Sequence, residues 1–191
     1  LFGSTYLVPI FLQIGLQYGA AEAGLVLLPA GLVLALAMPV TGRLADRYPT
    51  HRLVVLGLLV LAASFALLAT VNAQTRYLQL VLWVIVGRIG LALVMPSLSL
   101  SAMHGIGRDD IAQGTSTINF MRQLGGAVGV SLTGIALEWR LAAHGVTLHD
   151  DGVLAAARVR AFDETFVGVA AICAVAAVIA RRLRPAAVHD R

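Results

Sequence analysis

Residues 53–75 of the chain read LVVLGLLVLAASFALLATVNAQT, and after Arg76 residues 77–103 read YLQLVLWVIVGRIGLALVMPSLSLSAM. The first run carries no charged side chain, and the second carries only Arg88. An apolar helix of about 20 residues crosses the hydrocarbon core of a bilayer, which is about 30 Å thick. The two runs therefore predict two transmembrane helices joined by a short polar turn.

Three more apolar runs lie on either side of this pair. They are Ala23–Gly42, then Ile111–Leu137, which is broken only by Arg122, and Ala161–Ala180, which is broken by Asp163 and Glu164 near its start. The whole chain is 59% hydrophobic and 13% charged, with a mean hydropathy of +0.85. Soluble domains are about 45–50% apolar and about 25% charged. We therefore expect an all-α integral membrane protein with five complete spans.

The first residues form a sixth apolar segment, 1–17, which has no initial Met and no basic region before it. A secretory signal peptide is therefore not expected, and we interpret the chain as a fragment whose first span is truncated. The predicted fold is a six-helix transmembrane bundle followed by a cytoplasmic tail at 183–191. The predicted spans are roughly 1–17, 22–42, 53–72, 77–103, 111–137 and 161–182.

The basic residues predict the orientation in the membrane. All 14 are arginines, and the formal net charge is +4. Eight fall on one side of the alternating spans and four on the other. Because cytoplasmic loops are enriched in Arg and Lys, we expect the richer side and both chain ends to be cytoplasmic, and we expect no nucleic-acid partner. The eight are Arg43, Arg47, Arg52, Arg108, Arg181, Arg182, Arg184 and Arg191; the four are Arg76, Arg140, Arg158 and Arg160.

Polar residues inside the spans are the candidate functional groups. Arg88 and Arg122 each cost roughly 2.5–3.5 kcal/mol at mid-bilayer, so such residues usually mark a transport pathway or a buried pair. Asn119 shares a helix face with Arg122, and Gln123 follows it. The sequence leaves open whether these four side chains contact a translocated substrate or only join helices.

Small residues at helical spacing predict the helix contacts. A polar and small stripe runs along 111–137 at steps of 4, 3, 4, 3 and 4, and a second such stripe lies on 77–103. Close helix packing in bilayers selects small residues, so we expect these faces to meet protein or a cavity. The first stripe is Thr115, Asn119, Arg122, Gly126, Gly129 and Thr133, and the glycines assigned to packing are Gly87, Gly90, Gly125, Gly126 and Gly129.

The segment from Gly42 to Arg52 has a charge pattern of its own. Asp46 lies among Arg43, Arg47 and Arg52 and close to the positive N-terminus of the next helix. We predict a loop at 43–52 in which Asp46 meets the neighbouring arginines. The segment resembles the G-x-L-A-D-R-x-G-x-x-R loop in the second half of major facilitator superfamily transporters, and this resemblance implies a gating role for Gly42, Arg43, Asp46, Arg47 and Arg52.

A second match is more specific. Gly114-x-x-x-x-Asn119-x-x-Arg122-Gln123-Leu124-Gly125-Gly126-Ala127-x-Gly129 resembles the penultimate helix of fourteen-span drug:proton antiporters of the QacA/EmrB type. The segments Tyr6-Leu7-Val8-Pro9 and Ala23-Gly24-Leu25 are similar to earlier spans of that family, in the same order. The resemblance covers about the whole chain. It implies a C-terminal half that rocks against a missing N-terminal bundle, and an exchange of lipophilic or cationic compounds for protons.

No predicted span has a carboxylate in its middle, and such a group would be needed here if this half of the protein bound the exchanged protons. Arg does not release its proton in proteins, so we expect the proton site in the missing N-terminal half. Family members that export amino acids, siderophores or lipids share the same motifs and remain an alternative.

Other classes of function have less support. An intramembrane enzyme would need a buried base, and all five histidines lie in predicted loops or the tail. A pore lacks a filter-like loop or charged ring. The turn His149-Asp150-Asp151 lacks paired ligand spacing, and Cys173 is the single cysteine. We therefore expect no metal, no cofactor, no disulfide within the chain and no enzymatic activity.

Overall fold

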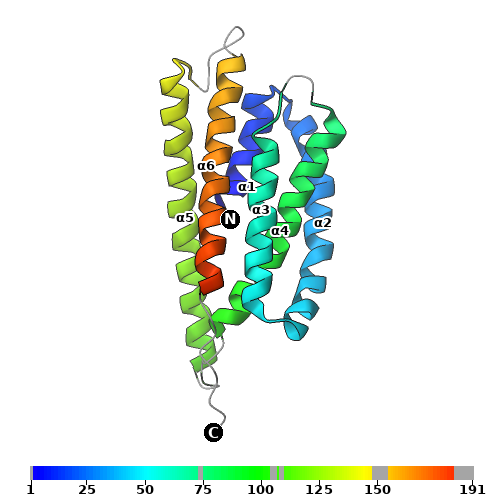
Figure 1. Cartoon of the computed structure of the whole chain (residues 1–191), viewed down its shortest axis with the longest axis vertical. Coiled ribbons are helices and arrows are strands. Elements are labelled where there is room, and N and C mark those ends of the chain that lie inside the picture. The colour runs from blue at the N-terminus through cyan, green and yellow to red at the C-terminus, as the bar shows by residue number, and fades with distance from the viewer. Residues whose placement is uncertain (1, 73–74, 104–106, 108–109, 148–154, 183–191) are drawn as a thin grey trace.

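The computed structural model describes residues 2–72, 75–103, 107, 110–147 and 155–182. The described residues form six α-helices and no strand, with the long axes of the helices roughly parallel (Figure 1). The all-α prediction is confirmed. The helices are α1 (Phe2–Ile10), which continues into a π-helical turn η1 (Phe11–Gly15), α2 (Ala20–Arg47), α3 (Thr50–Leu68), α4 (Tyr77–Met103), α5 (Ile111–Ala143) and α6 (Ala155–Arg182).

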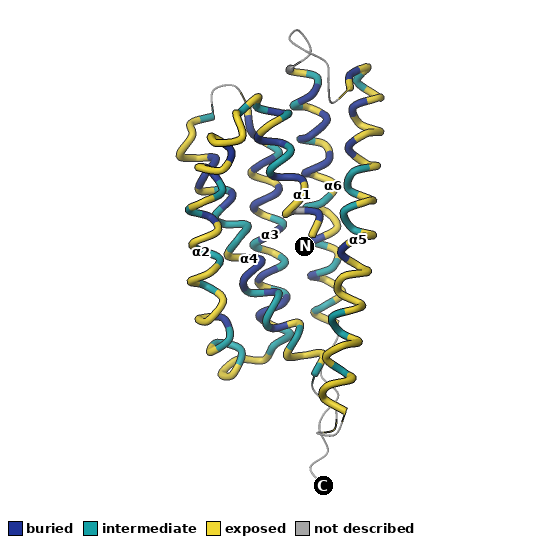
Figure 2. The backbone as a smooth tube through the Cα atoms, turned by 180° about the vertical axis from the view of Figure 1, so that it is seen from behind, coloured by how far each residue is buried: buried dark blue, intermediate teal, exposed yellow. Residues whose placement is uncertain are grey.

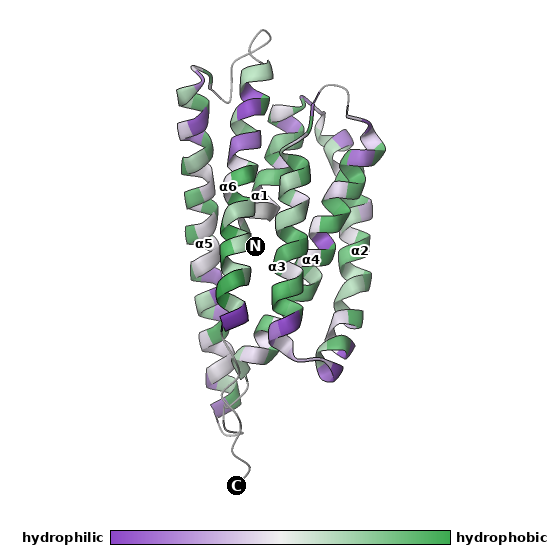
Figure 3. Ribbon diagram, in the orientation of Figure 1, coloured by the Kyte–Doolittle hydropathy of each residue, from purple (hydrophilic) through white to green (hydrophobic). Residues whose placement is uncertain are grey.

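Within the described residues, α2, α3, α4 and α6 are long and apolar enough to cross a membrane. Helix α5 has 33 residues but is not among these four. Its first half contains Gln113, Asn119, Arg122 and Gln123, which lower its hydropathy, and Figure 3 shows it paler than its neighbours. Polar side chains in a spanning helix face protein or water, so α5 needs a cover other than lipid.

The loop predicted at 43–52 has the wrong bounds. Helix α2 continues through Arg43 and Asp46 to Arg47, and the connection to α3 consists of Tyr48 and Pro49 only. The residue before a proline avoids helical backbone angles, and Tyr48 is extended, with φ −120° and ψ 148°. Pro49 therefore ends α2, whereas the charged residues before it continue the helix.

Two other predicted connections are also shorter than expected. The predicted spans leave a connection between residues 17 and 22, but α2 already begins at Ala20, and in its first turn the Glu22 carboxylate accepts a hydrogen bond of 3.0 Å from the Gly19 N–H. This contact satisfies one of the free amides that every helix start exposes. The connection that the predicted spans leave between residues 137 and 161 is also shortened, because α5 runs on to Ala143 and α6 already begins at Ala155. The predicted tail at 183–191 lies outside the described residues.

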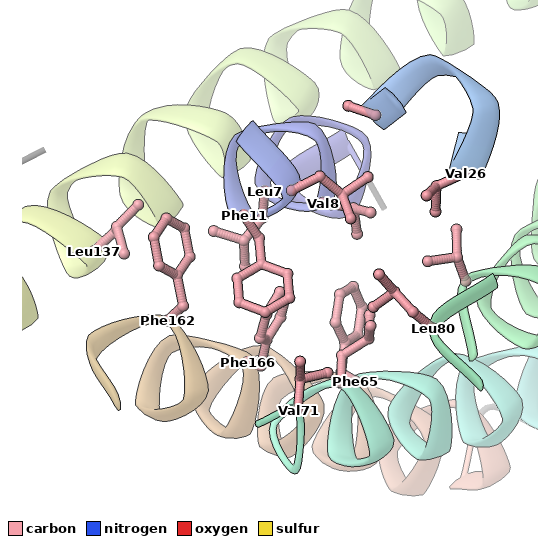
Figure 4. Close-up of a cluster of buried hydrophobic side chains, with 14 of the residues drawn as sticks. Leu7, Val8, Phe11, Val26, Phe65, Val71, Leu80, Leu137, Phe162 and Phe166 are labelled. Atoms are coloured by element: carbon pink, nitrogen blue, oxygen red, sulfur yellow. The ribbon is translucent and has the colours of Figure 1, made fainter. Parts of the chain in front are cut away.

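Aromatic side chains from three helices form the centre of the core. The Phe11 ring packs at 5.3 Å from that of Phe162 and at 5.1 Å from that of Phe166, and Phe166 in turn stacks on Phe65 (Figure 4). All four side chains are buried. Such aromatic pairs add about 0.5–1.5 kcal/mol beyond the burial of their area. The cluster ties the α1–η1 segment to α3 and α6.

Glycines bring α3 and α4 into close contact. A Cβ at Gly90 would lie 2.8 Å from the Gly57 carbonyl oxygen and 2.8 Å from the Leu61 nitrogen. A Cβ at Gly87 would lie 2.6 Å from the Ser64 hydroxyl, which donates a 2.8 Å hydrogen bond to the Trp83 carbonyl. The two helix backbones can approach this closely only because these positions carry no side chain.

The outer helices α2 and α5 have few buried residues. Figure 2 shows exposed residues along most of their length, whereas α3 alternates buried and exposed faces. Only Gly126, Leu137 and Leu141 are buried on α5, and it packs mainly against α1 and α6. The described bundle therefore leaves one long face of α5 uncovered.

Candidate functional site

The candidate site lies on the lower half of α5, as oriented in Figure 1. The Asn119 Oδ1 accepts a 2.7 Å hydrogen bond from the Arg122 Nη2, one helical turn away. The nearby Thr115 and Thr117 hydroxyls donate to carbonyls of their own helix, at 2.7 Å and 3.0 Å. Arg122 and Asn119 are therefore the polar pair on this face that can still bind other groups.

Two clefts meet at Arg122. The first has a volume of about 520 Å³ and lies between α5 and α6, bordered by the start of α1. The second has a volume of about 370 Å³ and lies between α4 and α5, where Ser99 and Thr117 add hydroxyl groups to an otherwise apolar lining. Arg122 and Met121 line both clefts. A guanidinium at such a junction can bind an anionic or carbonyl group that enters from either side.

The polar and small stripe of α5 divides into two parts in the structure. In the upper part, Gly126 packs on the Phe2 ring, and a Cβ at Gly3 would lie 2.6 Å from the Thr133 hydroxyl. That hydroxyl is already satisfied, because it donates a 2.7 Å bond to the Gly129 carbonyl. The upper part is thus a helix contact with α1, while the lower part, with Arg122 and Asn119, borders the clefts.

Not all of the glycines that were assigned to helix packing contact another helix in the structure. A Cβ at Gly125 or at Gly129 would meet nothing within 4 Å in the described chain, because both positions line the 520 Å³ cleft. Gln123 is exposed and makes no hydrogen bond to the described residues. Of the α5 residues selected from the sequence, the structure brings together Asn119, Arg122 and, through the cleft, Gly125, Gly126 and Gly129.

Arg88 lies apart from this group. It is half-buried in the middle of α4, beside Gly87, and lines a small space with Val8 and Ser64. It makes no hydrogen bond or ion pair with any residue that the structure describes. A guanidinium has five N–H donors, so Arg88 retains its full capacity for a partner outside the described chain.

The residues selected from the Gly42–Arg52 segment lie at the bottom end of the bundle in Figure 1. Arg43, Asp46 and Arg47 occupy the last turn and a half of α2, and Arg52 lies in the first turn of α3. The four charged side chains are exposed, and none forms an ion pair within the described part of the chain. The contact expected between Asp46 and its neighbouring arginines is therefore not made in this conformation.

Sequence reasoning missed a cluster of charges at the other end. Glu164 on α6 lies 3.3 Å from the Arg140 Nη1 and 3.2 Å from the His144 Nε2, both on or next to α5. A spacing of four residues places Arg140 and His144 on one helix face, which is the one local signal in the sequence. Their partner is 20 or more residues away, and only the packing of α5 on α6 identifies it.

The architecture defines the class of protein before any comparison. Several apolar helices long enough to span a bilayer, with guanidinium groups at mid-helix, are the features of a multi-pass membrane protein. No group of three or more potential metal-binding side chains occurs among the described residues.

Comparison with known proteins identifies the family. A family profile described as Major Facilitator Superfamily matches residues 1–130. The chain belongs to this superfamily of membrane transporters. The Listeria monocytogenes lincomycin resistance protein LmrB is 31% identical over 132 residues, which are 69% of this chain and 28% of LmrB.

Two further relatives carry similar names. The multidrug transporter protein MdtP of Bacillus subtilis is 27% identical over 140 residues, which are 73% of this chain and 26% of MdtP. The multidrug resistance protein B homolog of Mycobacterium tuberculosis is 31% identical over 142 residues, again 73% of this chain and 26% of the relative. The matched segment thus spans about a quarter of the length of these relatives.

Proposed function

We propose that the full-length protein is a secondary transporter that exports small lipophilic or cationic compounds in exchange for protons. Residues 1–191 supply most of its second six-helix bundle. The family and the printed names of three relatives, for multidrug transport, multidrug resistance and lincomycin resistance, support this proposal. The function is transport and not catalysis.

The observation that carries the proposal is the Arg122–Asn119 pair at the junction of two clefts. The pair sits on the helix that the rest of the bundle covers least. In transporters built from two bundles, substrate sites lie near the bilayer midplane at the interface between the bundles. Arg122, Asn119 and Gln123 are the residues we assign to that interface, with Arg88 as a second intramembrane charge.

Protons need a different site. Among the described residues no Asp or Glu lies in the middle of a helix: Glu22 is at the start of α2, and Asp163 and Glu164 are in the first third of α6. Arginine cannot supply a proton at physiological pH. The N-terminal bundle of the same protein is therefore the proposed partner that holds the coupling carboxylate, and lipid covers the remaining outer faces.

An efflux assay tests this function. We expect the full-length protein, expressed in a strain stripped of drug exporters, to expel ethidium, and we expect an uncoupler to stop the efflux. Residues 1–191 expressed alone serve as the matched control and should show none, because one bundle cannot enclose a site that two bundles form. Uncoupler-insensitive efflux would rule out antiport, and no efflux of any drug tested would favour an exporter of amino acids, siderophores or lipids.

We place the protein in the cell membrane with both ends of this chain in the cytoplasm, because eight of the twelve arginines outside the spans predicted from the sequence fall on one side of the alternating spans. In full-length protein from which Cys173 and every other cysteine have been removed, a single cysteine at Ala143 should react with an impermeant maleimide added to intact cells. A cysteine at Thr50 should react only after the cells are opened. The reverse pattern would invert the orientation.

A further inference from the structure

Glu164 joins α5 to α6 through both of its carboxylate oxygens. The Arg140 Nη1 lies 3.3 Å from the Oε2, and the His144 Nε2 lies 3.2 Å from the Oε1. Both contacts join residues that are 20 or more positions apart in the sequence. All three side chains are partly exposed, with fractions of 56% for Arg140, 28% for His144 and 41% for Glu164, so water and protons reach the cluster.

The cluster closes one end of the 520 Å³ cleft. Arg140 and Glu164 both line that cleft, and Arg122 lines its other end. Beside the cluster, Leu137 and Leu141 are the buried residues near this end of α5. The outer part of α5 is therefore held to the bundle by a small apolar contact and by the side chains of Arg140, His144 and Glu164.

The three side chains respond differently to pH. Arg140 stays protonated at every physiological pH, so its pair with Glu164 is constant. Imidazole is the side chain that changes charge between pH 5 and 8, and a charge-assisted hydrogen bond is roughly twice as strong as a neutral one. The remaining charged groups near this end of the two helices, in the described residues, are Glu138 on α5 and Arg158, Arg160 and Asp163 on α6.

We propose that His144, Glu164 and Arg140 form a proton-responsive contact that regulates the position of α5. The physiological role of this contact rests on the proposed function, whereas the contact itself is a feature of the structure. When His144 binds a proton, Glu164 pairs with two cations and holds α5 against α6. When His144 loses the proton, the contact weakens and the outer end of α5 separates from α6 more often.

This contact can act on the candidate site because both lie on or directly next to one continuous helix, α5. Asn119 and Arg122 lie on α5, and a helix transmits a movement of one end to the other. The cluster lies at the end opposite the Tyr48–Pro49 connection, which is the outer end in the proposed orientation (Figure 1). The pH outside the cell would then bias which conformation of α5 is populated.

The test measures the distance between α5 and α6 and does not depend on transport. Spin labels are attached at Ala142 and Ala156, both exposed, in the purified full-length protein in lipid nanodiscs, after Cys173 and every other cysteine have been removed. The distance distribution is recorded from pH 8.5 to pH 5.5. We expect the ratio of close to separated conformers to rise about two- to fivefold on acidification over this range, as for a partly exposed ion pair.

Variants assign the response to the cluster. His144→Gln keeps a hydrogen-bond donor but no charge, so its distribution should not change with pH. His144→Arg should give the acid distribution at every pH. Glu138→Gln removes an exposed carboxylate at the same end and should respond as the wild type does. An unchanged wild-type distribution, or a response that persists in His144→Gln, would overturn the proposal, whereas a pH response without any drug efflux would overturn the proposed function alone.

Discussion

Full-length protein carrying Gly90→Leu is expected not to accumulate as a folded protein in the membrane. Even the Cβ of the new side chain would lie 2.8 Å from two backbone atoms of α3, the Gly57 oxygen and the Leu61 nitrogen. Backbone cannot move aside as a flexible side chain can, so α3 and α4 would have to separate. Overpacking by a few carbon atoms already costs about 1–3 kcal/mol in a well-packed core.

The effect is measured by size-exclusion chromatography of the detergent-solubilised protein, which is detected through the fluorescence of a fused tag. We expect the monodisperse peak of the wild type to be lost in Gly90→Leu and reduced in Gly90→Ala. Gly24→Leu is the matched control, because a Cβ at Gly24 on α2 meets nothing within 4 Å. If Gly90→Leu eluted as the wild type does, the close contact between α3 and α4 would not exist.

Asp46→Asn is expected to lower the efflux rate of the full-length protein about five- to tenfold without lowering its abundance in the membrane. Asp46 is exposed and makes no ion pair with the described residues, so its charge contributes little to this conformation. Three arginines lie within six residues of it. If Asp46 pairs with them or with the other bundle in a second conformation, loss of the charge changes the populations of the two states.

Ethidium efflux normalised to the amount of protein in the membrane gives the measurement. Asp46→Glu keeps the charge and should retain most of the rate, which separates the effect of charge from that of shape. If Asp46→Asn showed normal efflux at wild-type abundance, the segment would have no gating role, and its arginines would only set the orientation in the membrane.

Some features of the fold followed from local patterns alone. Helix α4 has the same bounds, 77–103, as an apolar run in the sequence that carries only one charge, Arg88, because backbone groups in a bilayer must be satisfied within one helix. The end of α2 was harder to predict. Charges mark where a chain leaves the membrane but do not end a helix, so α2 continues for five residues past Gly42, as far as Arg47.

The candidate site was only partly predictable. Arg122 and Asn119 stand one turn apart on one helix, so their hydrogen bond follows from helical spacing. The clefts around them depend on how α4, α5 and α6 diverge. Glu164 was classed as a residue near a helix end, because nothing near it in the sequence points to His144, 20 residues earlier.

The sequence by itself determined that this is an all-helical membrane protein and which side chains cannot face lipid. Both are properties of single helices, since hydrophobic length and helical periodicity need no neighbour. Only the tertiary structure decided that Gly90 packs on backbone while Gly125 borders a cleft, and that Glu164 joins α5 to α6. These outcomes depend on which helices lie side by side, and similar stripes of small residues on several helices do not specify their partners.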